Sequence, residues 1–170
     1  MEGIVCSGID KGKKTTYALL DERVPPTREL CREEALARLA SRYFQSHSPA
    51  QLQDFVWWSG LTATECRLAI NLIKTELITE TFDSREYFIH QSWKGKNESK
   101  PVLRLLPAFD EYLISYKNRT DVLPLEHHPK AFNRFGTFYP VILYNGKIIG
   151  NWSRSIKKNT IHCLLYTSDA

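Results

Sequence analysis

Cysteine is scarce in this sequence and is not spaced as a metal ligand. The 170 residues include 4 cysteines, with no Cys-x-x-Cys pair and no histidine at zinc-ligand spacing. We therefore expect free thiols, a reducing compartment and no metal, although the scattered spacing leaves a disulfide open. The cysteines are Cys6, Cys31, Cys66 and Cys163.

Long apolar runs are also missing. No stretch approaches the roughly 18 apolar residues that cross a bilayer, and Met1 to Ile4 lacks the basic start of a secretory signal. We expect a soluble intracellular protein without a membrane partner. With 42% hydrophobic and 12% aromatic residues, the composition is that of a folded globular protein. The length allows one ordinary domain or two small ones and excludes a large enzyme barrel.

Acidic residues are absent from one long stretch. Residues 1–100 hold 14 Lys or Arg and 14 Asp or Glu, whereas residues 101–170 hold 9 and 5. Between Lys130 and Thr160 there are six basic residues and no acidic one. This distribution fits a surface that binds a polyanion, and it fits equally a surface that only keeps the protein soluble.

The first 26 residues predict a hairpin. β-favouring runs at 4–8 and 15–20 flank the turn-rich basic segment 9–14. Because a lone hairpin is marginal in water, we expect residues 1–26 either to pack on later elements or to be left from a preceding winged helix of a longer chain.

Residues 27–92 predict a winged helix domain. Apolar spacing indicates a helix over 29–44. Ser48, as an N-cap followed by Pro49 and Gln51, indicates a second helix, and the capping box of Thr62 and Glu65 opens a third. Strand-like runs at 77–82 and 86–90 follow. This order is the winged helix-turn-helix plan, which also occurs in protein-interaction modules.

After the polar segment 93–101 the pattern becomes mostly β. Strands are expected at 102–106 and 138–144, with a helical turn at 109–114 between them. Asn145-Gly146 is a strong hairpin signal, with residues 147–152 returning. The sequence therefore predicts a β-rich C-terminal unit over 101–160 and an α+β fold for the whole chain.

Three collinear segments resemble one known family: residues 42–61 with Trp57-Trp58, residues 105–119, and the 140–152 hairpin. They are similar to the bacterial winged helix DNA-binding proteins of the AlkZ/YcaQ-like crosslink-repair DNA glycosylase family. The resemblance implies tandem winged helices, excision of alkylated bases without a metal or other cofactor, and double-stranded DNA as partner. It also implies a cytoplasmic protein, associated with the nucleoid when bound to DNA, and we expect a monomer.

The resemblance places the catalytic glutamine-x-glutamine or glutamine-x-aspartate pair in a first winged helix. We therefore expect this chain to be a C-terminal fragment with no catalytic residue of its own. Gln51-Leu52-Gln53 has a similar form. The plainer interpretation is that Gln51 caps a helix and Gln53 is exposed to solvent. Residues 162–170 match nothing in the family pattern and are expected to be a non-native tail.

Basic side chains of the C-terminal half are the expected phosphate contacts. Asp110 is either lesion-facing or, with Glu111, placed in the first turn of a helix. One of Trp57 and Trp58 should pack in the core and the other at an inter-domain surface. The expected nucleic-acid-binding residues are Lys117, Arg119, Lys130, Arg134, Lys147 and Arg154.

Two further groups have alternative interpretations. The polar side of the third helix either reaches DNA or packs on another domain. His127-His128 is expected to be a loop pair and not a metal site. The polar side of the third helix consists of Thr62, Thr64, Arg67, Asn71 and Lys74.

Three functions fit these observations. The first is a fragment of a DNA-repair glycosylase acting on alkylated or crosslinked bases. The second is a non-catalytic DNA-binding transcription regulator, and the third is an interaction module without a nucleic-acid partner.

Overall fold

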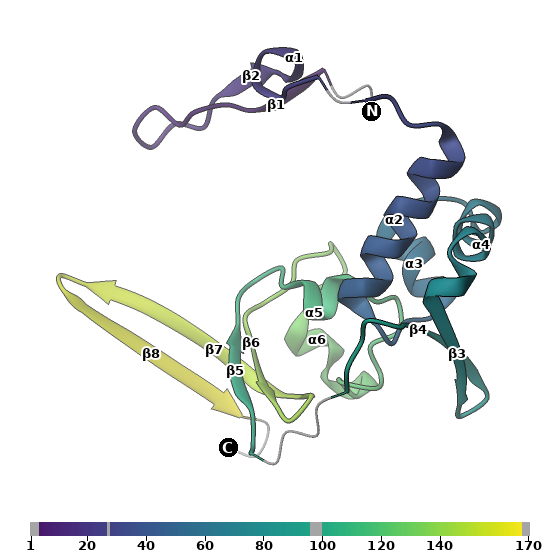
Figure 1. The fold of residues 1–170 in the computed structure, drawn as a ribbon. Helices are drawn as coiled ribbons and strands as arrows, with labels where there is room; N and C mark the ends of the chain where they lie inside the picture. The colour runs from purple at the N-terminus through teal and green to yellow at the C-terminus, as the bar shows by residue number, and fades with distance from the viewer. Residues whose placement is uncertain (1–3, 27, 96–99, 168–170) are drawn as a thin grey trace. The chain divides into compact units, whose positions relative to one another are not determined.

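The structure is a computed structural model that describes residues 4–26, 28–95 and 100–167. The chain forms two compact units, residues 1–32 and residues 33–170. The first unit is a small hairpin with one short helix. The second contains a group of helices and a four-stranded sheet (Figure 1).

The expected N-terminal hairpin is present in the first unit. Strand β1 (Val5–Ser7) pairs antiparallel with β2 (Tyr17–Leu19), and α1 (Leu20–Arg23) follows directly. None of the described side chains of residues 4–26 is buried. The interpretation of this hairpin as the remainder of a preceding winged helix stays a prediction.

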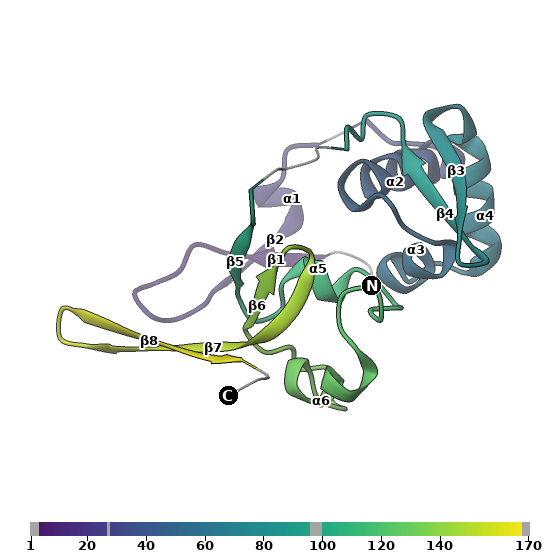
Figure 2. The same cartoon turned by 90° about the horizontal axis from the view of Figure 1, so that it is seen from below.

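The second unit begins with the expected order of three helices and a hairpin. Figures 1 and 2 show the helices gathered in one group with the hairpin beside them. A short 3-10 turn, η1, leads into the hairpin. The elements are α2 (Arg32–His47), α3 (Leu52–Ser59), α4 (Ala63–Leu72), η1 (Lys74–Glu76), β3 (Leu77–Phe82) and β4 (Arg85–His90).

Aromatic side chains dominate the core of these helices. Tyr43 and Phe44 of α2 are fully buried, and both contact Phe55 of α3, with ring centres 5.0 and 5.5 Å apart. Helix α4 begins with the expected capping box, because Thr62 Oγ1 accepts from the N–H of Glu65 and Glu65 accepts from the N–H of Thr62. Local sequence signals therefore position both α3 and α4 against α2.

The predicted start of the second helix is wrong. Ser48 is not the N-cap, because its hydroxyl donates to Phe44 O at 2.5 Å and accepts from His90 N–H at 2.8 Å. Ala50 pairs with Phe88 in an isolated bridge, so the chain just before this helix lies against β4. The helix begins after Gln51, whose N–H donates to Asp54 Oδ2 at 2.9 Å.

The β-rich part is an antiparallel sheet in the order β5-β6-β7-β8. Asn145-Gly146 forms the expected turn between β6 and β7, with φ values of 47° and 81°. Short helices cover one side of the sheet. The elements are β5 (Leu103–Leu106), α5 (Glu111–Ile114), η2 (Leu125–His127), α6 (His128–Ala131), β6 (Val141–Tyr144), β7 (Lys147–Lys157) and β8 (Thr160–Thr167).

The sheet continues beyond the expected limit at residue 160. Strand β8 pairs with β7 from Thr160 to Thr167, so it includes much of the segment expected to be non-native. Main-chain hydrogen bonds form this pairing, and a main chain of any sequence carries the same donors and acceptors. The non-native origin of 162–170 therefore stays a prediction, and residues 168–170 lie outside the described part.

The helical and β-rich parts of the second unit share a buried seam. Tyr116 O–H donates to His47 O at 3.0 Å, and Tyr43 O–H donates to Ser115 O at 3.3 Å. Asp54 Oδ1 accepts from the N–H of Lys117 at 2.9 Å. The parts expected as domains 27–92 and 101–160 thus lie largely within one compact unit, and their status as domains stays a prediction.

Across the described residues, no helix is long and apolar enough to span a membrane. The same part of the chain contains no cluster of three or more His, Cys, Asp or Glu side chains that could hold a metal ion.

Replacing Asp54 should destabilise the fold strongly. Its side chain is 3% exposed, and Asp54→Ala leaves the N–H groups of Gln51, Lys117 and Asn118 without their acceptor. We expect a loss of about 3 kcal/mol in the free energy of unfolding, measured by urea denaturation. Asp54→Asn, which keeps one acceptor oxygen, should lose less. Gln53→Ala on the exposed side of the same helix should change stability by less than about 0.5 kcal/mol, and an equal loss there would contradict the interpretation.

Candidate nucleic-acid interface

The β7–β8 hairpin extends past the rest of the sheet as a two-stranded arm. Strand β6 pairs with β7 only as far as Asn151, whereas β7 and β8 remain paired to Lys157 and Thr160. The part of β7 beyond its pairing with β6 spans about 20 Å at 3.3 Å per residue, and Figure 1 shows the hairpin projecting from the sheet. Its exposed cations are Arg154, Lys157 and Lys158.

Five of the six predicted phosphate-contact residues have exposed side chains. Arg154 lies on the arm, and Lys147 lies at the other end of β7, where its Nζ donates to Asp121 O at 2.5 Å. The guanidinium of Arg134 stacks on Phe135, with 4.8 Å from its carbon to the ring centre. Lys117 and Lys130 are exposed on the loop after α5 and on α6.

Arg119 is the exception, and the structure contradicts its prediction as a phosphate contact. The residue is only 9% exposed. Its Nε donates to Leu113 O at 2.5 Å, and its guanidinium lies 5.2 Å from the ring centres of both Phe132 and Phe138. Burial lowers the pKa of this guanidinium. Arg119 therefore stabilises the core beneath the sheet and does not face solvent.

Asp110 acts as the N-cap of α5. Its Oδ1 accepts from the N–H of Tyr112 at 2.9 Å, which explains an aspartate at this position by helix capping alone. The neighbouring Glu111 is exposed and accepts a hydrogen bond from Ser115 Oγ. A lesion-facing role for Asp110 stays a proposal.

The two tryptophans point in different directions, as the sequence predicts. Trp58 packs against the helical core, with its ring centre 5.0 Å from that of Tyr43. Trp57 is 53% exposed, and its Nε1–H donates to Ile114 O at 2.9 Å in the β-rich part. Trp57 thus helps to hold α5 against α3.

The polar side of α4 is exposed at Thr64, Arg67 and Asn71. The β3–β4 hairpin is tied to the β-rich part, because Arg85 at the start of β4 donates to both oxygens of Asp121, at 2.9 and 3.3 Å. Tyr87 O–H also donates to Asp121, at 3.0 Å. Asp121 is thus the partner of Arg85 within the structure. DNA contacts by α4 stay a proposal.

Asp121 is the charged centre of this connection. Burial acts to raise its pKa, but the hydrogen bonds from Arg85 and Tyr87 outweigh burial and hold the pKa below its ordinary value. Beside it, a cavity of about 260 Å³ lies between the helical and β-rich parts. Burial raises the pKa of Tyr116, which lines this cavity, to about 12, so its hydroxyl stays a neutral donor.

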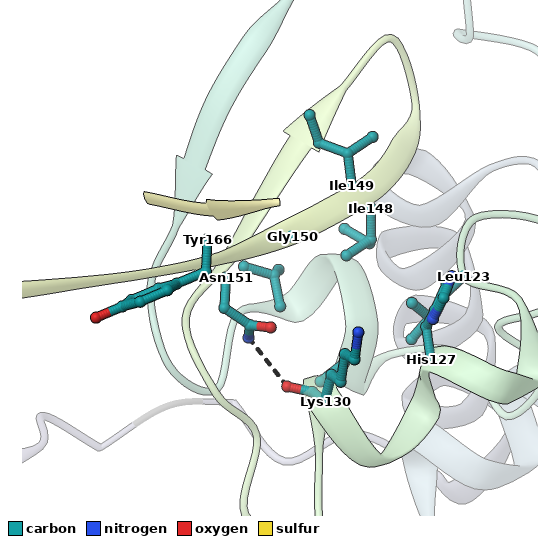
Figure 3. A pocket seen from close by; sticks show the side chains of 10 residues that line it. Leu123, His127, Lys130, Ile148, Ile149, Gly150, Asn151 and Tyr166 are labelled. Carbon is teal, nitrogen blue, oxygen red and sulfur yellow. Dashed lines mark hydrogen bonds between the residues drawn. The ribbon is translucent and has the colours of Figure 1, made fainter. Parts of the chain in front are cut away.

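A second hollow, of about 190 Å³, lies between α6 and strands β7 and β8 (Figure 3). Leu123 and Ile148 form apolar walls, and Asn151 donates to Lys130 O at 3.0 Å along one side. His127 lines it too, whereas His128 hydrogen bonds to Leu123 O, with 3.3 Å between Nε2 and oxygen. The hollow is smaller than the 300–1,000 Å³ or so of a typical ligand site, and we assign it no ligand.

Sequence reasoning missed Asp54 and Asp121 as organising carboxylates. Each receives hydrogen bonds from partners more than 30 residues away, at Lys117 and Arg85 respectively. The proximity of Gln51 to Asp54 was a usable local signal for a capping interaction. The distant partners leave no trace in local spacing.

Comparison with known proteins agrees with the fold. The family described as DNA glycosylase AlkZ-like matches residues 1–167. The chain belongs to this family. The matched range includes most of the segment 162–170 that the sequence pattern set apart.

A curated relative and a solved structure, both from Streptomyces sahachiroi, are similar to this AlkZ-like chain. An interstrand DNA cross-link repair glycosylase is 25% identical over 159 residues, which is 88% of this chain and 43% of that protein. The solved structure of DNA glycosylase AlkZ has a TM-score of 0.77 at 21% identity, covering 98% of this chain and 47% of the other. The chain therefore spans less than half the length of these relatives.

Stability should depend on acid through Asp121. Because the folded-state pKa of this carboxyl is lowered, its contribution is present above the ordinary aspartate pKa of about 3.9 and is lost as pH falls below it. Arg85→Ala should remove part of this dependence, so the difference in unfolding free energy between wild type and variant should shrink from pH 7 to pH 3. Urea titrations at both values measure it, with Arg67→Ala on α4 as the matched control. A constant difference would assign Arg85 a role independent of the carboxylate.

Proposed function

We propose that this chain is the DNA-binding part of a DNA-repair glycosylase that acts on alkylated or crosslinked bases. The carrying observation is that an AlkZ-like chain has six basic residues and no acidic one between Lys130 and Thr160, with Arg154, Lys157 and Lys158 exposed on a projecting arm. A two-stranded ribbon can enter a DNA groove. The phosphate contacts proposed from exposed positions are Lys117, Lys130, Arg134, Lys147 and Arg154.

The helical part supports a winged helix within residues 27–92. Three helices and the β3–β4 hairpin follow in the expected order, and the hairpin is held by Arg85 to Asp121. In this proposal α4 is the helix that faces DNA, with Arg67 and Asn71 on its exposed side. The partner is double-stranded DNA, and the protein acts as a monomer in the bacterial cytoplasm, associated with the nucleoid when bound.

Catalysis in this proposal comes from a winged helix outside the described residues. Gln51 is the N-cap of α3, and Gln53 is exposed on that helix. Gln51 lines the cavity beside Tyr116, whereas Gln53 lines a different hollow, beside Trp57, so the two amides do not converge on one reacting atom. A glutamine pair in the coding sequence upstream of Met1 is required by a glycosylase and not by a transcription regulator, which makes it the discriminating observation.

Binding to duplex DNA should weaken with salt in proportion to the phosphates contacted. The double variant Lys147→Ala/Arg154→Ala should lower the slope of log K against log salt by about 1.8, from about 0.9 per contact. Fluorescence anisotropy with a labelled duplex over a salt series measures this slope. Arg104→Ala, on β5 at the opposite edge of the sheet, should leave it unchanged. An unaltered slope in the double variant would remove both residues from the interface.

The 170-residue chain should bind alkylated duplex without releasing bases. Excision requires groups fixed at the extruded nucleotide to stabilise the developing charge, and the amides of Gln51 and Gln53 diverge. Abasic sites, detected by strand cleavage in alkali, should stay at the level of a protein-free control. Release above that level that disappears in Gln51→Ala or Gln53→Ala would overturn this assignment of the catalytic unit.

A further inference from the structure

The loop between α6 and β6 has a fixed conformation. Asn133 Oδ1 accepts from the N–H groups of Phe135 at 2.9 Å and Thr137 at 3.0 Å, and its own N–H donates to Thr137 O at 3.0 Å. Gly136 has φ of 79° and donates to Asn133 O at 3.1 Å. The left-handed φ favours glycine, so the sequence matches this tight turn.

The loop is anchored in the core of the β-rich part. Phe132 and Phe138 pair across its base as an isolated bridge, with ring centres 5.1 Å apart. Phe138 is buried, and Arg119 stacks on both rings. Movement of the loop tip relative to the sheet would disturb these contacts, so the loop presents its tip rigidly.

An aromatic side chain stands at this tip. Phe135 is 79% exposed, the highest value among the large exposed hydrophobic residues described. Single exposed hydrophobic residues are common, so exposure alone carries no function. Here the ring also carries the guanidinium of Arg134 on its face, at 4.8 Å. A rigid turn thus holds an exposed ring and a cation together.

The charge around the loop selects the partner. The stretch from Lys130 to Thr160 has six basic residues and no acidic one. It contains the whole loop and the two strands that follow it, β6 and β7. A polyanion gains from this environment, whereas an apolar protein surface would have to bury the Arg134 guanidinium. Apolar side chains wedged between base steps, supported by arginine at the minor groove, are a known way of kinking duplex DNA.

We propose that Phe135 is a wedge that enters a base step of duplex DNA from the minor groove and unstacks it, with Arg134 contacting the adjacent backbone. This inference rests on the proposed DNA-binding function and adds the residue that deforms the duplex. Flexible pyrimidine–purine steps such as TA are the favoured sites, because they cost least to unstack.

The test uses the full chain and a duplex with 2-aminopurine at a central TA step, whose fluorescence rises when stacking is lost. Wild type should raise the fluorescence on binding. Phe135→Ala should abolish the rise and weaken Kd by about tenfold, the size expected for one lost base–aromatic contact, while the salt slope stays the same. Phe135→Leu should retain part of the rise. Arg134→Ala should lower the salt slope by about 0.9.

Leu125→Ala is the matched control, because Leu125 is also exposed, at 67%, in the same half of the chain. It should leave fluorescence and affinity unchanged, and thermal melting should show that all variants fold. Binding without a fluorescence rise, or a rise that survives in Phe135→Ala, overturns the wedge and leaves the proposed function intact. Absence of duplex binding by wild type overturns both. A change of mass in sedimentation caused by Phe135→Ala, with fluorescence unaltered, would assign the ring to self-association instead.

Discussion

The second unit depends on one buried carboxylate. Asp54 accepts hydrogen bonds from Gln51 N–H at the start of α3 and from Lys117 and Asn118 N–H in the β-rich part. A hydrogen bond to a charged group contributes about 1.5–3 kcal/mol, more than a neutral one. The same side chain therefore begins a helix and joins two segments more than 60 residues apart.

The segment from Ser115 to Asp121 makes these contacts in succession. Tyr116 reaches α2, Arg119 reaches the aromatic base of the Asn133–Thr137 loop, and Asp121 holds the β3–β4 hairpin through Arg85. Consecutive residues of one loop thus have partners in different elements. This explains why residues 33–170 form one compact unit even though the sequence changes character near residue 93. A polar connecting segment marks a change of secondary structure, but a domain boundary also requires few contacts across it.

Local chemistry made much of this fold predictable, and long-range contacts made the rest inaccessible. The Thr62–Glu65 capping box and the Asn145-Gly146 turn depend on residues within a few positions, and both form as predicted. Ser48 has the composition of an N-cap, yet contact with His90, 42 positions away, takes its hydroxyl. Arg119 looks like its neighbour Lys117 in sequence, and only the tertiary structure separates a buried cation from an exposed one. For the candidate site, the charge distribution could be predicted from the sequence, but the contacts of each basic side chain could not.

The cations of the chain divide by their partners. Arg85 has a carboxylate and Arg119 has carbonyl oxygens and aromatic rings, so their charges are used within the structure. Beyond Glu126 the sequence has no acidic residue until Asp169, so the basic side chains of β7 and of the Asn133–Thr137 loop lack nearby carboxylates in sequence. Lys147 reaches Asp121 from the end of β7, whereas Arg154, Lys157 and Lys158 are exposed on the arm. A polyanion can displace the solvent ions around such exposed cations. The proposed phosphate contacts therefore depend on the absence of acidic residues from this stretch of the sequence.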